Sequence, residues 1–294
     1  MTRPPLSVVV ASINGMPYLE SCVAALAEHA PEAEVVVADA TDEATRRLVR
    51  ERWPDVRLVS FDEPKTVPEL RAAGIAAATA PYVALIEDHC LVPPEWAETL
   101  LRAHGEGRPV VGGAVRNVVT DRLRDWAAFF CEYSEHMEPV PAGEVAALPG
   151  MNVSYDRRAL EEIDELLREG RWETWLHAHL RRRGFGLWAE PRATIEHAKD
   201  FDLREFLSQR YHYSRSYAGM RNPELGRKRV LYALGSPALV PVVYARIARN
   251  VLRRRHRREL LAATPLILLY TLVWSGGEAV GYALGGGRSL LKVR

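Results

Sequence analysis

The chain has 294 residues, of which 48% are hydrophobic and 26% charged, enough for one large domain or one domain with an appendage. Its net charge of +1 is divided unevenly: residues 221–294 carry 14 Lys and Arg against three acids, or +11, whereas residues 1–220 carry −10. A basic tail with long apolar runs favours a membrane surface over nucleic acid as partner. The three widely spaced cysteines include no CxxC pair, which points to buried or free thiols in a reducing compartment.

The first 115 residues alternate between short apolar strands and amphipathic helices. The N-terminus runs directly into a strand and has no signal-peptide pattern, so we expect the body of the protein in the cytosol. The expected strands are 6–12, 34–40, 56–61, 82–86 and 109–115. The expected helices are 17–30, 42–53 with a cap at Thr41 or Asp42, 68–80 and 93–105. This alternation predicts an α/β fold with a mainly parallel sheet, in which ligands bind outside the carboxyl ends of the strands.

The middle of the chain is less regular. A loop or strand begins at residue 148, and residues 186–197 are expected to be extended. The expected helices are 121–137, 157–169, 170–184 and 202–220.

The tail contains two apolar segments that flank a basic one. Residues 230–248 are broken by Gly and Pro, residues 249–259 are rich in arginine, and residues 260–287 hold a long apolar stretch interrupted by Glu278. The last stretch satisfies the requirement of about 20 apolar residues for a helix that crosses a bilayer. Two full crossings would place the arginine-rich loop outside, against the positive-inside tendency. We therefore favour a segment that lies in, or re-enters from, the cytoplasmic interface; a hairpin of two spans and a buried helical subdomain stay open.

Three ionisable residues end the fourth expected strand: Glu87, Asp88 and His89. Carboxylate oxygens and a neutral imidazole suit a divalent cation such as Mg²⁺ or Mn²⁺, and at the end of a strand they would face the ligand crevice. The other interpretation is a solvated turn whose acids cap the helix expected at 93.

Three further polar side chains have two interpretations each. Asp39 ends the second strand, where it could bind a nucleoside or cap the next helix. Arg71 lies early in an alanine-rich helix, either as an exposed cation for a base or phosphate or as an ordinary surface arginine. Arg210 lies on a helix rich in Tyr and Arg, where an arginine could reach a diphosphate or the helix could rest on the membrane interface.

Six segments in order resemble the family 2 glycosyltransferases, which have the GT-A fold. They are SVVVASINGMPYLESCVAAL, VVVADATDEAT, PELRAAGIAAATAPYVALIEDHCLVPPEWAETLL, LPGMNVSYDRRAL, WETWLHAHLRRRGFGL and EPRATIEH. The resemblance covers residues 6–215 and implies a domain over 1–220, with a nucleotide-sugar half (1–117) and an acceptor half (118–220), followed by a membrane-associated helical tail over 221–294.

The resemblance also implies roles for particular residues. Glu173 stands at the position of the catalytic base. The implied metal ligands are Glu87, Asp88, His89 and His197, which would hold Mn²⁺ or Mg²⁺. The implied donor-binding residues are Ser12, Asn14, Asp39, Arg71, Asp88 and Arg210. The implied acceptor-binding residues are Asn152 and Trp172.

Together these implications describe an inverting, metal-dependent glycosyltransferase at the cytoplasmic face of the cell membrane, anchored through its tail. The expected partners are a UDP- or GDP-sugar donor, a lipid-linked or glycan acceptor and the membrane surface, with no nucleic acid. The alternatives are a catalytically inactive, membrane-attached module that binds a nucleotide-sugar, and a nucleotidyltransferase.

Overall fold

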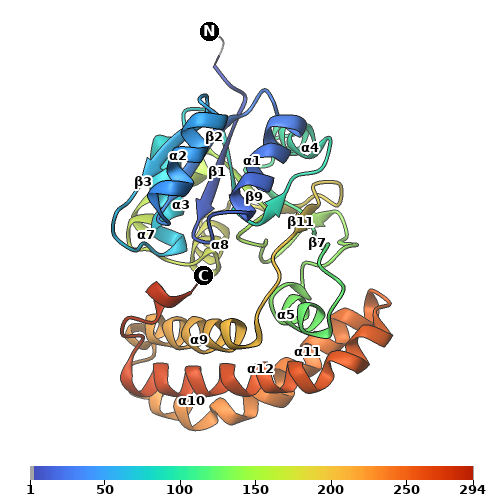
Figure 1. The fold of residues 1–294 in the computed structure, drawn as a ribbon. Coiled ribbons are helices and arrows are strands. Elements are labelled where there is room, and N and C mark those ends of the chain that lie inside the picture. The colour runs from blue at the N-terminus through green and yellow to red at the C-terminus, as the bar shows by residue number, and fades with distance from the viewer. Residues whose placement is uncertain (1–2, 294) are drawn as a thin grey trace. The chain divides into compact units, whose positions relative to one another are not determined.

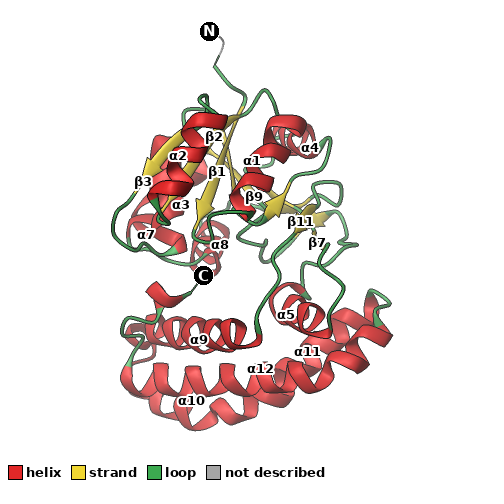
Figure 2. Ribbon diagram, viewed as in Figure 1, coloured by secondary structure: helices red, strands yellow, loops and turns green. Residues whose placement is uncertain are grey.

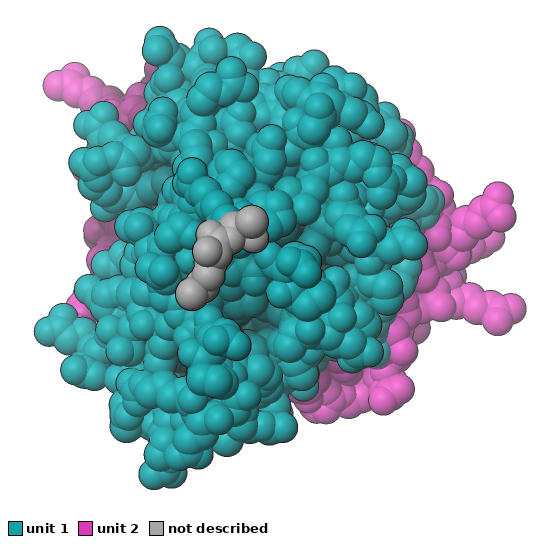
Figure 3. All heavy atoms as spheres, turned by 90° about the horizontal axis from the view of Figure 1, so that it is seen from above, with its two compact units in different colours: residues 1–118, 136–199 teal, residues 119–135, 200–294 magenta. Residues whose placement is uncertain are grey.

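The computed structural model describes residues 3–293. It forms two compact units: unit 1 contains residues up to 118 and residues 136–199, and unit 2 contains residues 119–135 and 200 onward (Figure 3). The predicted boundary between residues 220 and 221 falls inside helix α9 (Leu203–Leu225), all of which belongs to unit 2.

Unit 1 is built on a twisted sheet flanked by helices (Figure 2). Within the described residues the sheet has eight strands in the order β3-β2-β1-β4-β9-β6-β10-β8. Their bounds are β1 Leu6–Ser12, β2 Glu34–Asp39, β3 Arg57–Ser60, β4 Tyr82–Glu87, β6 Val110–Gly112, β8 Gly143–Glu144, β9 Val153–Asp156 and β10 Leu187–Ala189. The first four strands of the chain are parallel, as the alternation of strands and helices predicted. Buried β-branched and aliphatic side chains fill β1, β2 and β4, which is typical of a sheet covered on both faces.

The helices of unit 1 begin close to their predicted positions. Their bounds are α1 Tyr18–His29, α2 Glu43–Arg52, α3 Val67–Ala77, α4 Trp96–Gly105, α6 Arg157–Glu162, α7 Asp164–Arg168 and α8 Glu173–Arg182. Asp42 caps α2 by accepting a hydrogen bond from the Thr45 amide at 2.8 Å. A capping box between Thr66 and Glu69 starts α3, which fixes the helix that carries Arg71.

The fifth expected strand is wrong as a single element. Residues 109–115 are divided between β6 and β7 (Val115–Asn117), and β7 belongs to a separate sheet with β11 (Ile195–His197) and β5 (Cys90–Leu91). The chain bends at Gly112 and Gly113, where a Cβ on Gly113 would lie 1.9 Å from the Ala193 carbonyl oxygen. In addition, β9 lies antiparallel between β4 and β6, so the sheet is mixed rather than wholly parallel.

Unit 2 consists of helices in the described part of the chain. Their bounds are α5 Leu123–Tyr133, α9 Leu203–Leu225, η1 Gly226–Lys228, α10 Arg229–Gly235, η2 Ser236–Ala238, α11 Leu239–Arg253, α12 Arg257–Leu284 and η3 Leu290–Lys292. Helices α9 and α12 lie side by side, and α10 and α11 lie along α12 as well (Figure 1). By length and composition, the segments 203–253 and 257–284 each contain an apolar stretch long enough to cross a membrane.

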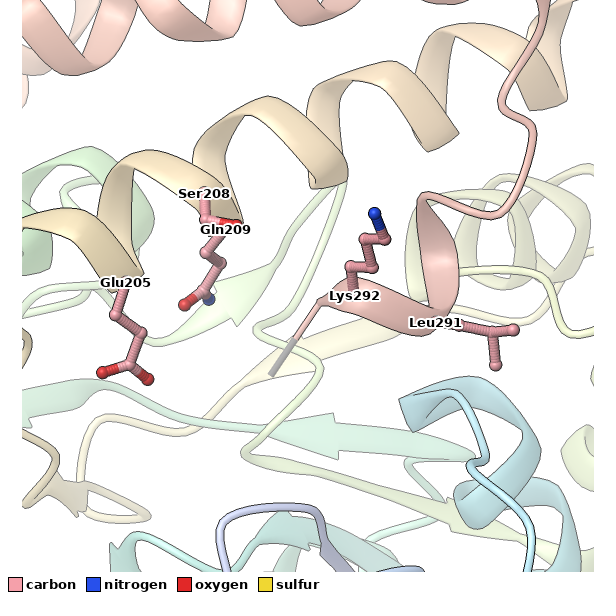
Figure 4. Close-up of a pocket in the computed structure, with 5 residues that line it drawn as sticks. All are labelled: Glu205, Ser208, Gln209, Leu291 and Lys292. Carbon is pink, nitrogen blue, oxygen red and sulfur yellow. The ribbon is translucent and has the colours of Figure 1, made fainter.

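A pocket of about 270 Å³ opens between α9 and η3 in unit 2. Glu205, Ser208 and Gln209 line it from α9, and Leu291 and Lys292 line it from η3 (Figure 4). A second pocket, of about 310 Å³, lies in unit 1 between Met16 and α2. Neither pocket is lined by the residues that the sequence assigns to catalysis.

Candidate active site

Asp88 joins the ends of β1 and β4. Its Oδ2 accepts hydrogen bonds from the amides of Ile13, Asn14 and Gly15 at 2.9, 2.7 and 3.0 Å, and its Oδ1 accepts one from Asn14 Nδ2 at 2.6 Å. Burial alone would raise the pKa of Asp88, but hydrogen bonds from His89 and Asn14 hold it below its ordinary value. Because Asp88 is fully buried and both its oxygens serve the loop after β1, its position is that of a structural anchor for the site.

Glu87, Arg71 and Glu173 form a connected chain of charges. Arg71 Nη2 donates to Glu87 Oε1 at 2.7 Å, and Arg71 Nη1 donates to Glu173 Oε2 at 3.2 Å. These residues come from β4, α3 and the first turn of α8, three elements that are far apart in the sequence. The structure therefore places Glu87, a predicted metal ligand, and Glu173, the predicted base, on the guanidinium of Arg71.

The expectation that Arg71 is exposed is wrong. Its side chain is 7% exposed, because α3 packs against the sheet and directs it between the two glutamates. Although burial alone lowers the pKa of the Arg71 guanidinium, Glu87 and Glu173 raise it above its ordinary value. The group is a permanent cation held inside the site.

Gly150 makes room for the Glu173 carboxylate. A Cβ at position 150 would lie 2.7 Å from Glu173 Cδ and 2.9 Å from Arg71 Nη1. Behind this group, Tyr155 Oη and His177 Nε2 are 2.9 Å apart, and His177 Nδ1 accepts a hydrogen bond from the Leu148 amide at 3.4 Å. Burial, with smaller contributions from His136 and Arg71, lowers the pKa of His177 to about 3. A neutral His177 thus links α8 to the segment that carries Gly150.

His89 and His197 are neighbours at the other side of Glu87. Their rings meet edge to face with centroids 4.8 Å apart, and His89 Nε2 lies 3.7 Å from Glu87 Oε2. His89 Nε2 is buried and has no hydrogen-bond partner among residues 3–293. Burial, followed by the charges of His89 and Lys199, holds the pKa of His197 well below its ordinary value, so its imidazole is neutral. The other interpretation of Glu87, Asp88 and His89 was a solvated turn whose acids cap the next helix. It is wrong, because α4 begins only at Trp96 and neither acid caps it.

Glu87 Oε2 and His89 Nε2 are the two donor atoms best placed for a cation. Over residues 3–293, no group of three or more His, Cys, Asp or Glu side chains is arranged to hold a metal ion by itself. A cation such as Mg²⁺ is commonly held by one or two protein groups together with phosphate oxygens and water. His89 Nε2, which has no hydrogen-bond partner among the described residues, and Glu87 Oε2 beside it suit a cation that is also held by a diphosphate.

Ser12 and Asp39 lie at the ends of β1 and β2. Ser12 Oγ donates to Asp39 Oδ1 at 2.9 Å, and Arg46 Nε donates to Asp39 Oδ2 at 2.9 Å. Both residues are fully buried. Asp39 does not cap α2, because Asp42 does.

Asn152 and Trp172, the two residues that the resemblance implies for acceptor binding, are buried. Asn152 Nδ2 donates to the carbonyl oxygens of Ala114 and Ala193 at 2.9 and 2.7 Å, and its Oδ1 accepts from Trp96 Nε1 at 3.0 Å. The amide of Asn152 therefore holds β9 to its neighbours. Trp172 directly precedes α8 and is 5% exposed.

Arg210 belongs to unit 2, whereas the other residues implied for donor binding belong to unit 1. Its guanidinium stacks on Trp274, 4.1 Å from the ring centroid, and lies 3.7 Å from Glu132 Oε1. Within unit 2 it links α9 to α12 and α5.

The sequence interpretation missed two residues at this site. Lys199 Nζ donates to Asn14 Oδ1 at 2.8 Å, and the Lys199 side chain is buried. The sequence signal that could have identified Lys199 is its position two residues after the candidate ligand His197. Gly150 was also missed, although a glycine beside a proline in the acceptor-side segment is a common sign of close backbone approach.

With this geometry in place, comparisons with known proteins identify the class of protein. The model of the family described as glycosyl transferase family 2 matches residues 7–164. The chain belongs to glycosyltransferase family 2. It is therefore an enzyme of the glycosyltransferase class, which does not support the nucleotidyltransferase alternative.

Two individual proteins are similar to the chain. The glucosyl-dolichyl phosphate glucuronosyltransferase of Haloferax volcanii is 30% identical over 150 residues, which is 44% of the chain and 44% of the relative. The chain thus aligns with less than half the length of that relative. A mannosyltransferase from Pyrobaculum calidifontis, solved in complex with GDP-Man and Mn²⁺, is similar in structure with a TM-score of 0.55 and 17% identity, over 95% of this chain and 88% of that one. This likeness supports the predicted GT-A type fold.

Proposed function

We propose that this glycosyltransferase is metal-dependent and inverting, and that it transfers a sugar from a UDP- or GDP-sugar to a hydroxyl or phosphate acceptor on a lipid-linked carrier or glycan. The observation that carries the proposal is the chain Glu87–Arg71–Glu173, with contacts of 2.7 and 3.2 Å. In this arrangement Glu87, a proposed cation ligand, and Glu173, the proposed base, share the Arg71 guanidinium.

Glu173 is the proposed base. Its carboxylate takes the proton of an acceptor hydroxyl while that oxygen forms a bond to the anomeric carbon. The bond between the anomeric carbon and the diphosphate breaks, and the nucleoside diphosphate leaves with the electron pair. For a phosphate acceptor, whose oxygen is already ionised, no proton transfer is required. A single displacement inverts the configuration at the anomeric carbon.

Glu87 and His89 are the proposed protein ligands of a divalent cation, with His197 beside them. A bound Mn²⁺ or Mg²⁺ would neutralise charge on the diphosphate. The Pyrobaculum mannosyltransferase carries GDP-Man and Mn²⁺, which supports a nucleotide-sugar donor and a cation for this chain. Arg71 orients both glutamates. Asp88 and Asn14 hold the loop beside the donor crevice.

The acceptor and location are proposed on separate grounds. The name of the Haloferax relative contains a dolichyl-phosphate-linked sugar. In this chain, the segments 203–253 and 257–284 each contain a stretch apolar enough to cross a membrane. Both support a lipid-linked acceptor and a membrane-associated enzyme. The basic tail favours the cytoplasmic face.

Glu173→Gln tests the proposed base. We expect transfer to a hydroxyl acceptor to fall by roughly 10²- to 10⁴-fold, the usual contribution of a positioned base. Donor binding, measured by calorimetry with GDP-sugars and UDP-sugars, should survive because the amide keeps the shape of the side chain. Glu165→Gln, at an exposed position of α7, is the control and should leave the rate unchanged. Wild-type transfer by Glu173→Gln would remove Glu173 as the base.

A further inference from the structure

Helix α12 is long enough to cross a bilayer, with 28 residues from Arg257 to Leu284. At about 1.5 Å per residue it exceeds the hydrocarbon thickness of roughly 30 Å. Its packing in unit 2 decides whether it can do so.

Helix α9 packs along the carboxyl-terminal half of α12. The Phe206 and Tyr270 rings meet near one end, with centroids 4.6 Å apart, and Asn222 Nδ2 donates to the Gly281 carbonyl near the other at 3.0 Å. Between them the backbones approach closely, since a Cβ on Gly277 would lie 2.5 Å from the Tyr211 carbonyl oxygen. The two helices therefore form one packed pair that runs in the same direction.

Helix α9 is too polar to enter hydrocarbon. Its charged residues are Arg204, Glu205, Arg210, Arg215, Arg221 and Glu224. Charged side chains at membrane depth are unfavourable unless they face a protein interior or water. If α12 crossed the bilayer, it would draw these residues of its partner into the hydrocarbon core.

The outer side of α12 is apolar from Leu261 to Leu272. The exposed residues recur at helical spacing, at Leu261, Leu268 and Leu272, and this stripe lies opposite the contacts that α12 makes with α9. Helices α10 and α11 lie beside α12 through Ser236, whose carbonyl accepts from Ser275 Oγ at 2.8 Å. They expose further large apolar side chains: Val230, Leu231, Tyr232, Leu234 and Val242. An apolar surface of this extent marks an interaction site.

Basic residues lie at both ends of this apolar surface. Arg227, Lys228 and Arg229 lie at the amino end of α10. This end is next to the carboxyl end of α12, because the Tyr232 and Tyr282 rings are 5.4 Å apart. Residues 253–258 include five arginines and lie at the amino end of α12. A crossing helix would leave one of these clusters on the far side of the membrane, against the positive-inside tendency.

We propose that unit 2 lies in one leaflet of an anionic phospholipid bilayer, with α12 parallel to the membrane plane. The exposed side of α10, α11 and α12 inserts among the acyl chains, and the two basic clusters contact anionic headgroups of the same leaflet. This inference makes the proposed membrane association more specific, and only in that respect does it rest on the proposed function. Its tests involve no sugar transfer.

Cysteine accessibility tests the orientation of α12. Arg258→Cys places a thiol in the first turn of α12, Arg288→Cys places one just beyond its carboxyl end, and Glu51→Cys places one on the exposed surface of α2. All three are made in a Cys131→Ser background with the buried Cys22 and Cys90 retained. In intact cells that express the 294-residue chain, a membrane-impermeant maleimide should give the same result at all three positions. After lysis all three should react. If Arg258→Cys and Arg288→Cys differ before lysis, the helix crosses the membrane and the proposal fails.

Vesicle binding tests the surface. With vesicles of phosphatidylglycerol and phosphatidylcholine, we expect Leu231→Glu and Leu272→Glu to weaken binding at least tenfold. Leu123→Glu alters an exposed leucine of α5, outside the proposed surface, and should bind like the wild type. Binding should also weaken on vesicles of phosphatidylcholine alone. Equal binding by all three variants, or by both kinds of vesicle, would overturn the proposal.

Discussion

Arg71 concentrates the chemistry of the site in one side chain. Its guanidinium contacts Glu87 and Glu173 and is buried by α3 and the sheet. Two carboxylates in one buried site repel each other unless a cation lies between them. The placement of Glu173, the proposed base, therefore depends on Arg71.

Replacing Arg71 should destabilise the fold as well as the site. In Arg71→Met the two glutamates lose their buried counter-charge, and we expect the free energy of unfolding to fall by about 3 kcal/mol. Urea unfolding followed by tryptophan fluorescence measures this change. Arg102→Met removes an exposed arginine of α4 and should change stability by less than about 0.5 kcal/mol. Equal stabilities for the two variants would show that the charge chain contributes nothing.

Sequence reasoning found the acids of the site but not their connection. The order of the motifs pointed to Glu87, His89 and Glu173. In the structure both glutamates contact Arg71, and His89 packs against His197. The burial of Arg71 could not be predicted, because it depends on which face of an alanine-rich helix meets the sheet. The anchoring role of Asp88 depends on three backbone amides, which no side-chain pattern reveals.

At the scale of elements, the alternation of strands and helices predicted β1 to β4 and the crevice at their ends. It could not predict that β9 pairs between β4 and β6, because this pairing joins segments about 70 residues apart. The close packing of α9 on α12 did have a signal in the sequence. Gly277, Gly281 and Gly285 are four residues apart, the spacing that allows two helices to approach closely.

Two adjacent glycines of α12 provide a matched test of that packing. A Cβ on Gly277 would lie 2.0 Å from Ser214 Oγ, whereas a Cβ on Gly276 meets nothing within 4 Å. We expect Gly277→Ala to destabilise unit 2 by about 1–3 kcal/mol through overpacking. Gly276→Ala should stabilise it by about 0.5–1 kcal/mol, because alanine favours the helix. Thermal unfolding followed by circular dichroism measures both, and the same sign for both variants would refute the predicted packing of α9 on α12.

The buried histidines predict a loss of stability in mild acid. Burial lowers the pKa of His177 to about 3 and that of His104 to about 4, below the ordinary value of 6.5. The unfolded chain therefore binds more protons below pH 6.5, and stability falls as the pH falls. Between pH 6.5 and 5 we expect the two groups together to cost about 3 kcal/mol. Chemical denaturation at both pH values should show a smaller loss in a variant that combines His104→Gln and His177→Gln, and an unchanged loss would contradict this origin.

At the scale of the whole molecule, the sequence predicted a catalytic body followed by a basic, apolar tail. In the structure the two units are divided at other residues than predicted, because α5 and α9 belong with the tail helices in unit 2. A pattern based on hydropathy could not assign α9 to this unit, since the helix is polar and its partner lies more than 50 residues further along the chain. The long polar helix is also what argues against a crossing α12.

The central claim is that Glu87 and His89 share a divalent cation with the diphosphate of a nucleotide-sugar. Turnover of GDP- and UDP-sugars by the purified full-length chain, measured as released nucleoside diphosphate in EDTA and again after Mn²⁺ or Mg²⁺ is restored in excess, tests it most directly. We expect turnover to disappear in EDTA and to return with the cation, and we expect His89→Ala to require a higher cation concentration. Equal turnover in EDTA and in Mn²⁺ would contradict it.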